Sequence, residues 1–228
     1  MKQIALDIGL ASGPTLQNFF AGPNGDALSH LSLWLGQVQR GAPLAPVPLY
    51  LWGPAGSGKT HLLQAVRSAL LDRGASVGWL DPSVTEPSDY QGRWSVVLMD
   101  DVHLYTVAQQ HAAFNWFVNA QTHQVCVLGA GNLPPADLPL RDDLRSRLAW
   151  GHVFALQLLG DDQRRAVLRH AADGRGLFLS DEVMDFMLTR FSRDLSSLMA
   201  LLEVTDRYAL QERRAVTVPM IKAMMDEQ

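Results

Sequence analysis

Apolar residues in the first two thirds of the chain alternate between short continuous runs and longer stretches in which they recur about every 3.6 residues. The short runs are typical of buried strands, which we place at residues 48–52, 76–80, 95–99, 124–130 and 152–156. The helical spacing predicts helices at residues 28–39, 59–71 and 107–120. Strands that alternate with helices predict a parallel sheet covered on both faces, which is the α/β class.

The pattern changes after residue 156, where only helical spacing remains. We expect helices at residues 161–174, 180–191, 194–212 and 218–226. Near the start of the chain, the sequence ASGP has the composition of a linker. The expected organisation is an N-terminal tail (1–13), an α/β domain (14–157) and a small all-helical domain (158–228).

Charge and composition narrow the class of protein. The formal net charge of −4 gives no overall positive field, so any contact with DNA must be local or indirect. Arg164, Arg165 and Arg169 could form a weak DNA contact, but they are more typical of one solvated helix face. No apolar run approaches the roughly 20 residues of a membrane span, and Asp7 and Gly9 interrupt the first run too early for a signal peptide. We expect a cytoplasmic protein that does not bind membranes.

One short motif points to a phosphate ligand. It matches G-x-x-x-x-G-K-[ST] at every fixed position and consists of Gly53, Pro54, Ala55, Gly56, Ser57, Gly58, Lys59 and Thr60. The motif stands between a predicted strand and a predicted helix, where backbone N–H groups and the helix dipole attract phosphate. Lys59 is expected to bridge the β- and γ-phosphates and Thr60 to ligate Mg²⁺. The sequence therefore predicts a site for ADP or ATP with Mg²⁺.

Polar residues follow two of the other predicted strands. Asp100 and Asp101 end the run at 95–99, and we expect this strand end beside the phosphate loop. Asp100 would hold Mg²⁺ through water, while Asp101 would orient or deprotonate the attacking water; the alternative is a strand with an ordinary polar end. Asn132 follows the run at 124–130, and its amide could bond the γ-phosphate or the lytic water. A turn residue before two prolines is the alternative for Asn132.

Several segments together resemble the DnaA-related AAA+ family. They are the sequences TLQNFFAGPN at 15–24, GKTHLL at 58–63, the acid pair at 100–101, and LRSRLAWG at 144–151. The resemblance covers nearly the whole chain and implies an AAA+ sheet followed by a helical lid. It adds Phe20, Asn24 and His61 to the nucleotide site and places Asn132 at the sensor position. It also implies that Arg193 contacts the phosphates from the lid, with Arg190 as the competing residue.

The same resemblance gives Arg147 a role in a neighbouring subunit. In the family, the second arginine of the S-R-[LF] box reaches into the neighbour's nucleotide site, where a guanidinium suits phosphate oxygens. The alternative is that Arg141, Arg145 and Arg147 are solvated helix charges paired with Asp142 and Asp143. Asp101 replaces the usual Glu and Asn132 stands where relatives often have Asp. Intrinsic hydrolysis is therefore expected to be slow, and whether the chain acts as an ATPase by itself stays open.

The two ends of the chain suggest which partners it meets. The C-terminus leaves no room for the helix-turn-helix domain of DnaA, so we expect no direct operator recognition. The N-terminal residues Gln3, Ile4, Leu6 and Ile8 resemble a peptide that docks on the β sliding clamp, although their alternation also fits an edge strand. The expected contact with DNA is indirect, through the clamp.

These features together favour a regulatory role. The nucleotide-bound chain, preferably with ADP, would ride on the DNA-loaded clamp and present Arg147 to ATP-bound DnaA, which limits re-initiation. Two alternatives stay open: an autonomous AAA+ ATPase such as a helicase loader of the DnaC type, and a non-hydrolysing, nucleotide-dependent recruitment factor. The oligomeric state is also open, a homo-oligomer included.

Overall fold

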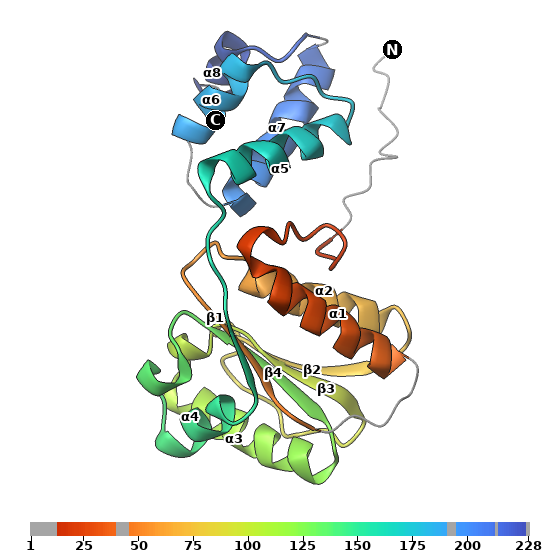
Figure 1. Cartoon of the computed structure of the whole chain (residues 1–228), viewed down its shortest axis with the longest axis vertical. Coiled ribbons are helices and arrows are strands. Elements are labelled where there is room, and N and C mark those ends of the chain that lie inside the picture. The colour runs from red at the N-terminus through yellow and green to blue at the C-terminus, as the bar shows by residue number, and fades with distance from the viewer. Residues whose placement is uncertain (1–12, 40–45, 191–194, 213, 227–228) are drawn as a thin grey trace. The chain divides into compact units, whose positions relative to one another are not determined.

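A computed structural model describes residues 13–39, 46–190, 195–212 and 214–226. The chain divides into two compact units, with the boundary after Leu158. The first unit contains the sheet and the second only helices (Figure 1). The expected α/β class with a C-terminal helical domain is confirmed. Within the described residues, no helix has both the length and the apolar character needed to cross a bilayer.

The described part of the chain contains a five-stranded parallel sheet with the order β2-β3-β4-β1-β5. Its strands are β1 (Leu49–Trp52), β2 (Ser76–Leu80), β3 (Trp94–Met99), β4 (Cys126–Gly131) and β5 (His152–Ala155). All of the strands expected from the apolar runs are present. β4 lies between β1 and β3, so the strand that ends in the two acids is one strand removed from the strand that leads into the phosphate loop.

Two helices cover one face of the sheet, α1 (Gly25–Gln39) and α2 (Lys59–Leu71) (Figure 1). Their buried leucines pack with the strands in one core cluster, which includes Leu31, Leu62, Leu63, Leu51, Leu98 and Leu128. A central strand buried on both faces explains why β4 is apolar at nearly every position.

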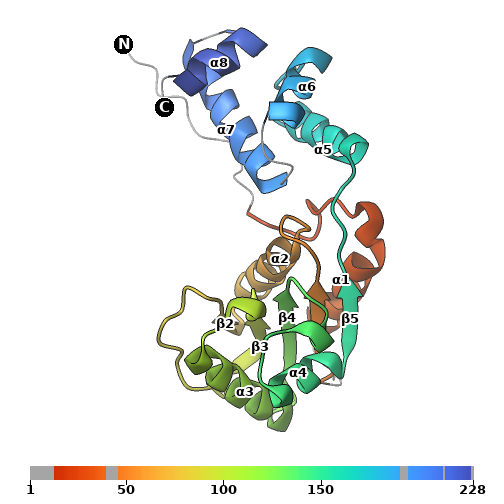
Figure 2. The same cartoon turned by 90° about the vertical axis from the view of Figure 1, so that its left-hand side faces the viewer.

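Two other helices, α3 (Val107–Thr122) and α4 (Asp142–Ala149), cover the opposite face (Figure 2). They form a second core cluster with residues such as Tyr50, Val97, Met99, Phe117 and Leu144. The sequence pattern did not identify α4 as a helix of this layer, because it has only eight residues and buries only Leu144 and Leu148. Short 3-10 turns precede α1, α3 and α4 at Gly22–Asn24, Val102–Leu104 and Pro135–Asp137.

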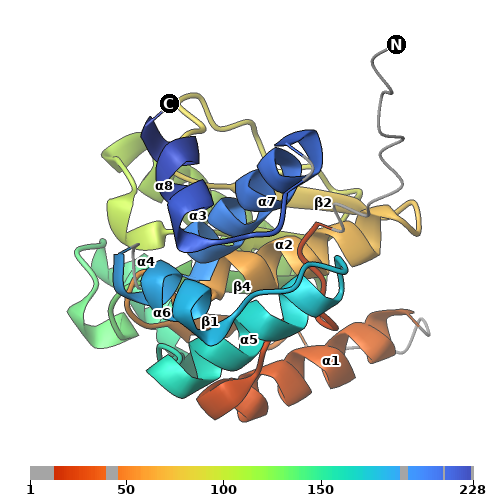
Figure 3. The same ribbon diagram turned by 90° about the horizontal axis from the view of Figure 1, so that it is seen from above.

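The second unit contains α5 (Asp161–Asp173), α6 (Asp181–Arg190), α7 (Leu195–Glu212) and α8 (Val218–Asp226) (Figure 3). Its helices share a core of their own, with Leu168, Met184, Leu202 and Ile221 fully buried. Arg165 and Arg169 form ion pairs with Asp181 at the start of α6. These two arginines therefore join α5 to α6.

Gln109 ties the long connection between β2 and β3 to the start of α3. Its side chain is buried, and Nε2 donates to the carbonyls of Asp81, Pro82 and Val84 at 3.2, 3.2 and 2.9 Å. Its Oε1 accepts the backbone N–H of Thr106 at 2.8 Å, which completes a capping box. The two hydrogens of Nε2 are shared among three carbonyls while Oε1 caps one N–H, so a single amide fixes the loop that follows β2.

We predict that Gln109→Leu lowers the free energy of unfolding by about 2–3 kcal/mol, because buried carbonyls and the Thr106 N–H lose their partners. Urea denaturation measures this change. The same substitution at the exposed Gln211 is the control and should stay within about 0.5 kcal/mol of the unmodified chain. Equal stability of the two variants would contradict the assignment.

Candidate nucleotide-binding site

The phosphate loop leaves β1 and enters α2 through backbone positions that only glycine fits. A Cβ at Gly53 would lie 2.2 Å from the carbonyl oxygen of Leu156, and one at Gly58 would lie 2.5 Å from the Phe19 ring. The N–H of Gly53 donates to the carbonyl of Gly131 at 3.2 Å, which joins the loop to the end of β4. The loop is therefore closely packed on both sides, and its conformation is fixed by its surroundings.

Lys59 is buried at the start of α2, and its amine is hydrogen-bonded to carbonyls of the phosphate loop. Its Nζ donates to the carbonyls of Gly53 and Pro54 at 2.8 and 2.9 Å. Burial lowers the pKa of this amine, while the nearby Asp101 and Asp100 act in the opposite direction. A cation held among carbonyls in this way is available to a stronger acceptor such as a phosphate oxygen.

Ser57, like Lys59, shows whether the loop fits a phosphate. Its side chain is buried, and within the described residues Oγ has no hydrogen-bond partner. A buried hydroxyl without a partner is costly in a folded protein. A phosphate oxygen would satisfy this hydroxyl, so the loop fits the ligand that its sequence predicts.

Asp100 and Thr60 meet although forty positions separate them in the sequence. Asp100 is buried at the end of β3 and accepts the backbone N–H of Asp101 at 3.0 Å and the hydroxyl of Thr60. Burial raises the pKa of the Asp100 carboxyl to about 6, against the lowering effect of the Thr60 hydroxyl. A carboxylate and a hydroxyl side by side form an oxygen donor set of the kind that Mg²⁺ prefers.

Asp101 turns the chain away from the sheet. Its φ of +47° is uncommon for a residue with a side chain, and it leads directly into the 3-10 turn before α3. The carboxylate is 40% exposed, and Oδ1 lies 4.0 Å from Nδ1 of His103. Asp101 is thus at the same strand end as Asp100 but remains open to solvent.

Tyr50 supports the predicted sensor residue, and sequence reasoning missed it. Its hydroxyl donates to the carbonyl of Leu133 at 2.9 Å, and a Cβ on Gly131 would lie 2.2 Å from that hydroxyl. Asn132 lies exposed between these two contacts, at the end of β4 and next to the phosphate loop. Only the burial of Tyr50 in a strand was visible in the sequence, and burial alone does not reveal its bond to the turn.

The segment before α1 packs against the loop through His61 and Phe19. Nε2 of His61 hydrogen-bonds the carbonyl of Thr15 at 3.0 Å, and its ring lies 5.6 Å from that of Phe19. Asn24 is buried and exchanges two hydrogen bonds with the main chain of Gln157, at 3.0 and 2.8 Å.

The Asn24 side chain therefore braces the chain after β5. Phe20 is 40% exposed. The nucleotide contacts expected of Phe20, Asn24 and His61 stay predictions.

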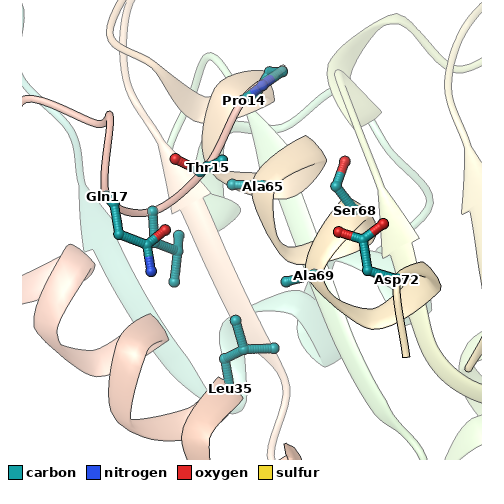
Figure 4. A pocket seen from close by; sticks show the side chains of 9 residues that line it. Pro14, Thr15, Gln17, Leu35, Ala65, Ser68, Ala69 and Asp72 are labelled. Atoms are coloured by element: carbon teal, nitrogen blue, oxygen red, sulfur yellow. The ribbon is translucent and has the colours of Figure 1, made fainter. Parts of the chain in front are cut away.

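A pocket of about 200 Å³ lies beside α2, on the half of the helix that is remote from the phosphate loop (Figure 4). Its lining comes from the segment at 14–17, from α1 and from α2. It contains no residue of the phosphate loop, so we assign it no part in nucleotide binding.

Arg147 differs from the other two arginines at α4. Arg141 pairs with Asp143 at 2.7 Å and Arg145 with Asp142 at 2.5 Å, as the alternative reading expected. Nη1 of Arg147 instead donates to Oε1 of Gln121 at 2.6 Å. Among the residues described, no carboxylate forms an ion pair with this guanidinium.

The guanidinium of Arg147 also lies over two aromatic rings of α3. Its central carbon is 5.2 Å from the centre of the Phe114 ring and 5.9 Å from that of Phe117. These contacts orient the group without neutralising its charge. The predicted residues Arg193, Gln3, Ile4, Leu6 and Ile8 lie outside the described part of the chain.

Comparisons with known proteins place this geometry in a family. Residues 161–225 match the family model described as Hda, lid domain. A Haemophilus influenzae protein described as uncharacterized is 31% identical over 238 residues, with 99% of each chain covered.

Two solved structures share the fold. Domain III of the Thermotoga maritima replication initiation protein DnaA aligns with a TM-score of 0.74 at 20% identity, covering 96% of this chain and 98% of that one. AMPPCP-bound DnaA from Aquifex aeolicus aligns with a TM-score of 0.68 at 22% identity, covering 90% and 71%.

The sheet order, the phosphate loop and the helical C-terminal unit give this chain the P-loop AAA+ fold. More particularly, its C-terminal residues 161–225 match the Hda lid domain, and its whole length aligns with domain III of DnaA. The resemblance noted from the sequence is thereby confirmed.

We predict that Asp100→Asn stabilises the nucleotide-free protein at about pH 8, by about 2–3 kcal/mol, while it abolishes Mg²⁺-dependent nucleotide binding. The pKa of Asp100 is raised to about 6, so its contribution to stability is present at low pH and is lost as the pH rises through that value. Asparagine mimics the protonated carboxyl at every pH.

Urea denaturation across pH tests this prediction. The difference between the two proteins should shrink as the pH falls from about 8 to about 4. A difference that stays constant over this range would rule out titration of Asp100 as its cause.

Proposed function

We propose that this chain is a regulatory inactivator of the replication initiator DnaA. In its nucleotide-bound form it docks on the DNA-loaded β sliding clamp and supplies Arg147 to the nucleotide site of ATP-bound DnaA. Hydrolysis of the DnaA-bound ATP then limits re-initiation. The match of residues 161–225 to the Hda lid domain supports the relation to DnaA. The single observation that carries the rest is the cation at Arg147 that no described carboxylate neutralises.

The chemistry of Arg147 suits action on a partner's phosphate. A guanidinium is planar, permanently charged and able to make two parallel bonds to phosphate oxygens. The Phe114 ring holds it in place, and the bond to the neutral Gln121 is weaker than one to a phosphate. An arginine supplied in trans can accelerate hydrolysis by roughly 10³ to 10⁵ because it stabilises charge that develops in the transition state.

The chain's own nucleotide site would act as a conformational support. Lys59, Ser57 and the loop N–H groups would hold the phosphates of ADP or ATP, and Thr60 with Asp100 would hold Mg²⁺. The bound nucleotide supplies the negative charge that the buried loop lacks. Asp101 and Asn132 would position water, but the short Asp101 side chain reaches less far than a Glu. We therefore expect slow intrinsic hydrolysis and favour ADP in the active form.

The proposed clamp contact uses the N-terminal segment. The amide of Gln3 would bond in a polar pocket, while Leu6 and Ile8 would fill an apolar one, with Ile4 beside them. DNA is then met only through the clamp, which agrees with the negative net charge of the chain.

We predict that Arg147→Ala loses nearly all of the acceleration of DnaA-bound ATP hydrolysis, by roughly 10³-fold or more. The assay measures hydrolysis of DnaA-bound ATP with ADP, clamp-loaded DNA and the chain. Arg145→Ala is the matched control, because Arg145 lies two positions before Arg147 on the same helix and is neutralised by Asp142. It should retain the acceleration.

Two results would contradict the arginine-finger role. One is full stimulation by Arg147→Ala. The other is brisk ATP turnover by the isolated chain with no effect on DnaA, which would favour the autonomous ATPase.

A second prediction tests the clamp segment. The double variant Gln3→Ala and Leu6→Ala should bind the clamp at least about tenfold more weakly and lose the clamp-dependent part of the stimulation, since hot-spot side chains dominate such small contacts. Nucleotide binding, measured by calorimetry, should not change. Lys2→Ala is the control. Unchanged stimulation by the double variant would show that recruitment does not use this segment.

A further inference from the structure

A small surface around Arg147 combines its charge with exposed apolar side chains. We call it the finger face and define it by Val118 and Gln121 of α3 and by Arg147 and Trp150 at the end of α4. Positions 118 and 121 are one helical turn apart, as are 147 and 150. Trp150 is 62% exposed and Val118 is 37% exposed. Both therefore lie open to solvent, each one helical turn from a residue of the Arg147–Gln121 pair.

Trp150 is presented by a fixed backbone. Its N–H donates to the carbonyl of Arg147 at 3.3 Å and so closes the last turn of α4. A Cβ on the following Gly151 would lie 1.9 Å from the carbonyl oxygen of Pro48, and that same carbonyl accepts the N–H of His152 at 2.9 Å. The chain after Trp150 is thus packed directly on the start of β1, so the backbone that carries the exposed indole is fixed.

The face also selects the charge of its partner. Arg141 and Arg145 are neutralised by neighbouring carboxylates, so the positive charge left near Trp150 is that of Arg147. A complementary surface must place an anionic group next to an apolar area. Tryptophan and arginine are the residue types most enriched among side chains that dominate binding energy.

We propose that Trp150 is the apolar anchor by which the finger face docks on the AAA+ domain of ATP-bound DnaA. This inference rests on the proposed function, in which the anionic group is the terminal phosphate of that ATP. In this arrangement Trp150 contributes affinity for DnaA, while Arg147 accelerates hydrolysis of the DnaA-bound ATP. The inference therefore predicts a separation between the concentration that is needed for stimulation and the maximal stimulation that is reached.

The experiment titrates the chain, with ADP and clamp-loaded DNA, against ATP-loaded DnaA and follows hydrolysis. For Trp150→Ala, we expect the half-maximal concentration to rise about 10- to 100-fold, with the plateau within about twofold of the unmodified chain. The half-maximal concentration for Trp150→Phe should lie between those of the unmodified chain and Trp150→Ala. Leu33→Ala is the control, because Leu33 is 69% exposed on α1, which covers the opposite face of the sheet, and it should leave both values unchanged. Circular dichroism and urea denaturation confirm that each variant folds.

The outcomes separate the anchor from the proposed function. If the unmodified chain stimulates and Trp150→Ala shares its half-maximal concentration, the anchor is wrong while the function stands. If Trp150→Ala lowers the plateau as Arg147→Ala does, Trp150 is not an affinity anchor.

If the unmodified chain does not stimulate hydrolysis, the proposed function fails. The affinities of the unmodified chain and of Trp150→Ala for ATP-loaded DnaA are then compared directly. Equal affinities would overturn the anchor role of Trp150. A change confined to self-association, seen by sedimentation, would assign the face to a second copy of the chain and also overturn the proposal.

Discussion

Two opposite charges, Lys59 and Asp100, are buried at the carboxyl ends of the strands, and the loops around them are built to satisfy both. Lys59 and Asp100 are both removed from water, and isolated buried charges are costly. Each is solvated locally instead, Lys59 by two carbonyls of its loop and Asp100 by the Thr60 hydroxyl and a backbone N–H. Such an arrangement is poised for a ligand that brings negative charge to the amine and a cation to the carboxylate.

The parallel sheet makes that arrangement possible and also separates it from the finger. Carboxyl ends of parallel strands meet at one edge, so the loop after β1, the acids after β3 and the turn after β4 come together. Tyr50 links β1 to the turn after β4, and Gly131 links that turn to the loop. Arg147 instead belongs to the helical layer on the face of the sheet that α3 covers, and the proposed function assigns it to a neighbouring molecule.

Local motifs explain why much of the fold could be predicted from the sequence. The strands and most helices follow from runs and periods within a few residues, and the phosphate loop is specified by eight consecutive positions. The insertion of β4 between β1 and β3 could not be predicted, because strand order is set by pairing between distant segments. The helix α4 was missed because two buried leucines are too few to establish a helical period.

The candidate site shows the same limit. Nothing in the local pattern indicates that Asn24 bonds the main chain of Gln157 or that Tyr50 supports the turn after β4, because both contacts join remote segments. It also could not separate Arg147 from Arg141 and Arg145, since all three lie close to the same two aspartates. Only side-chain geometry shows that Asp142 and Asp143 are taken by the other two arginines.

The most direct test of the account is a cryo-EM structure of the ADP-bound chain in complex with DnaA that holds a slowly hydrolysed ATP analogue. The account predicts that the Arg147 guanidinium leaves Gln121 and lies about 3 Å from oxygens of the partner's terminal phosphate. A complex in which Arg147 remains on Gln121, while another arginine of this chain contacts that phosphate, would contradict it.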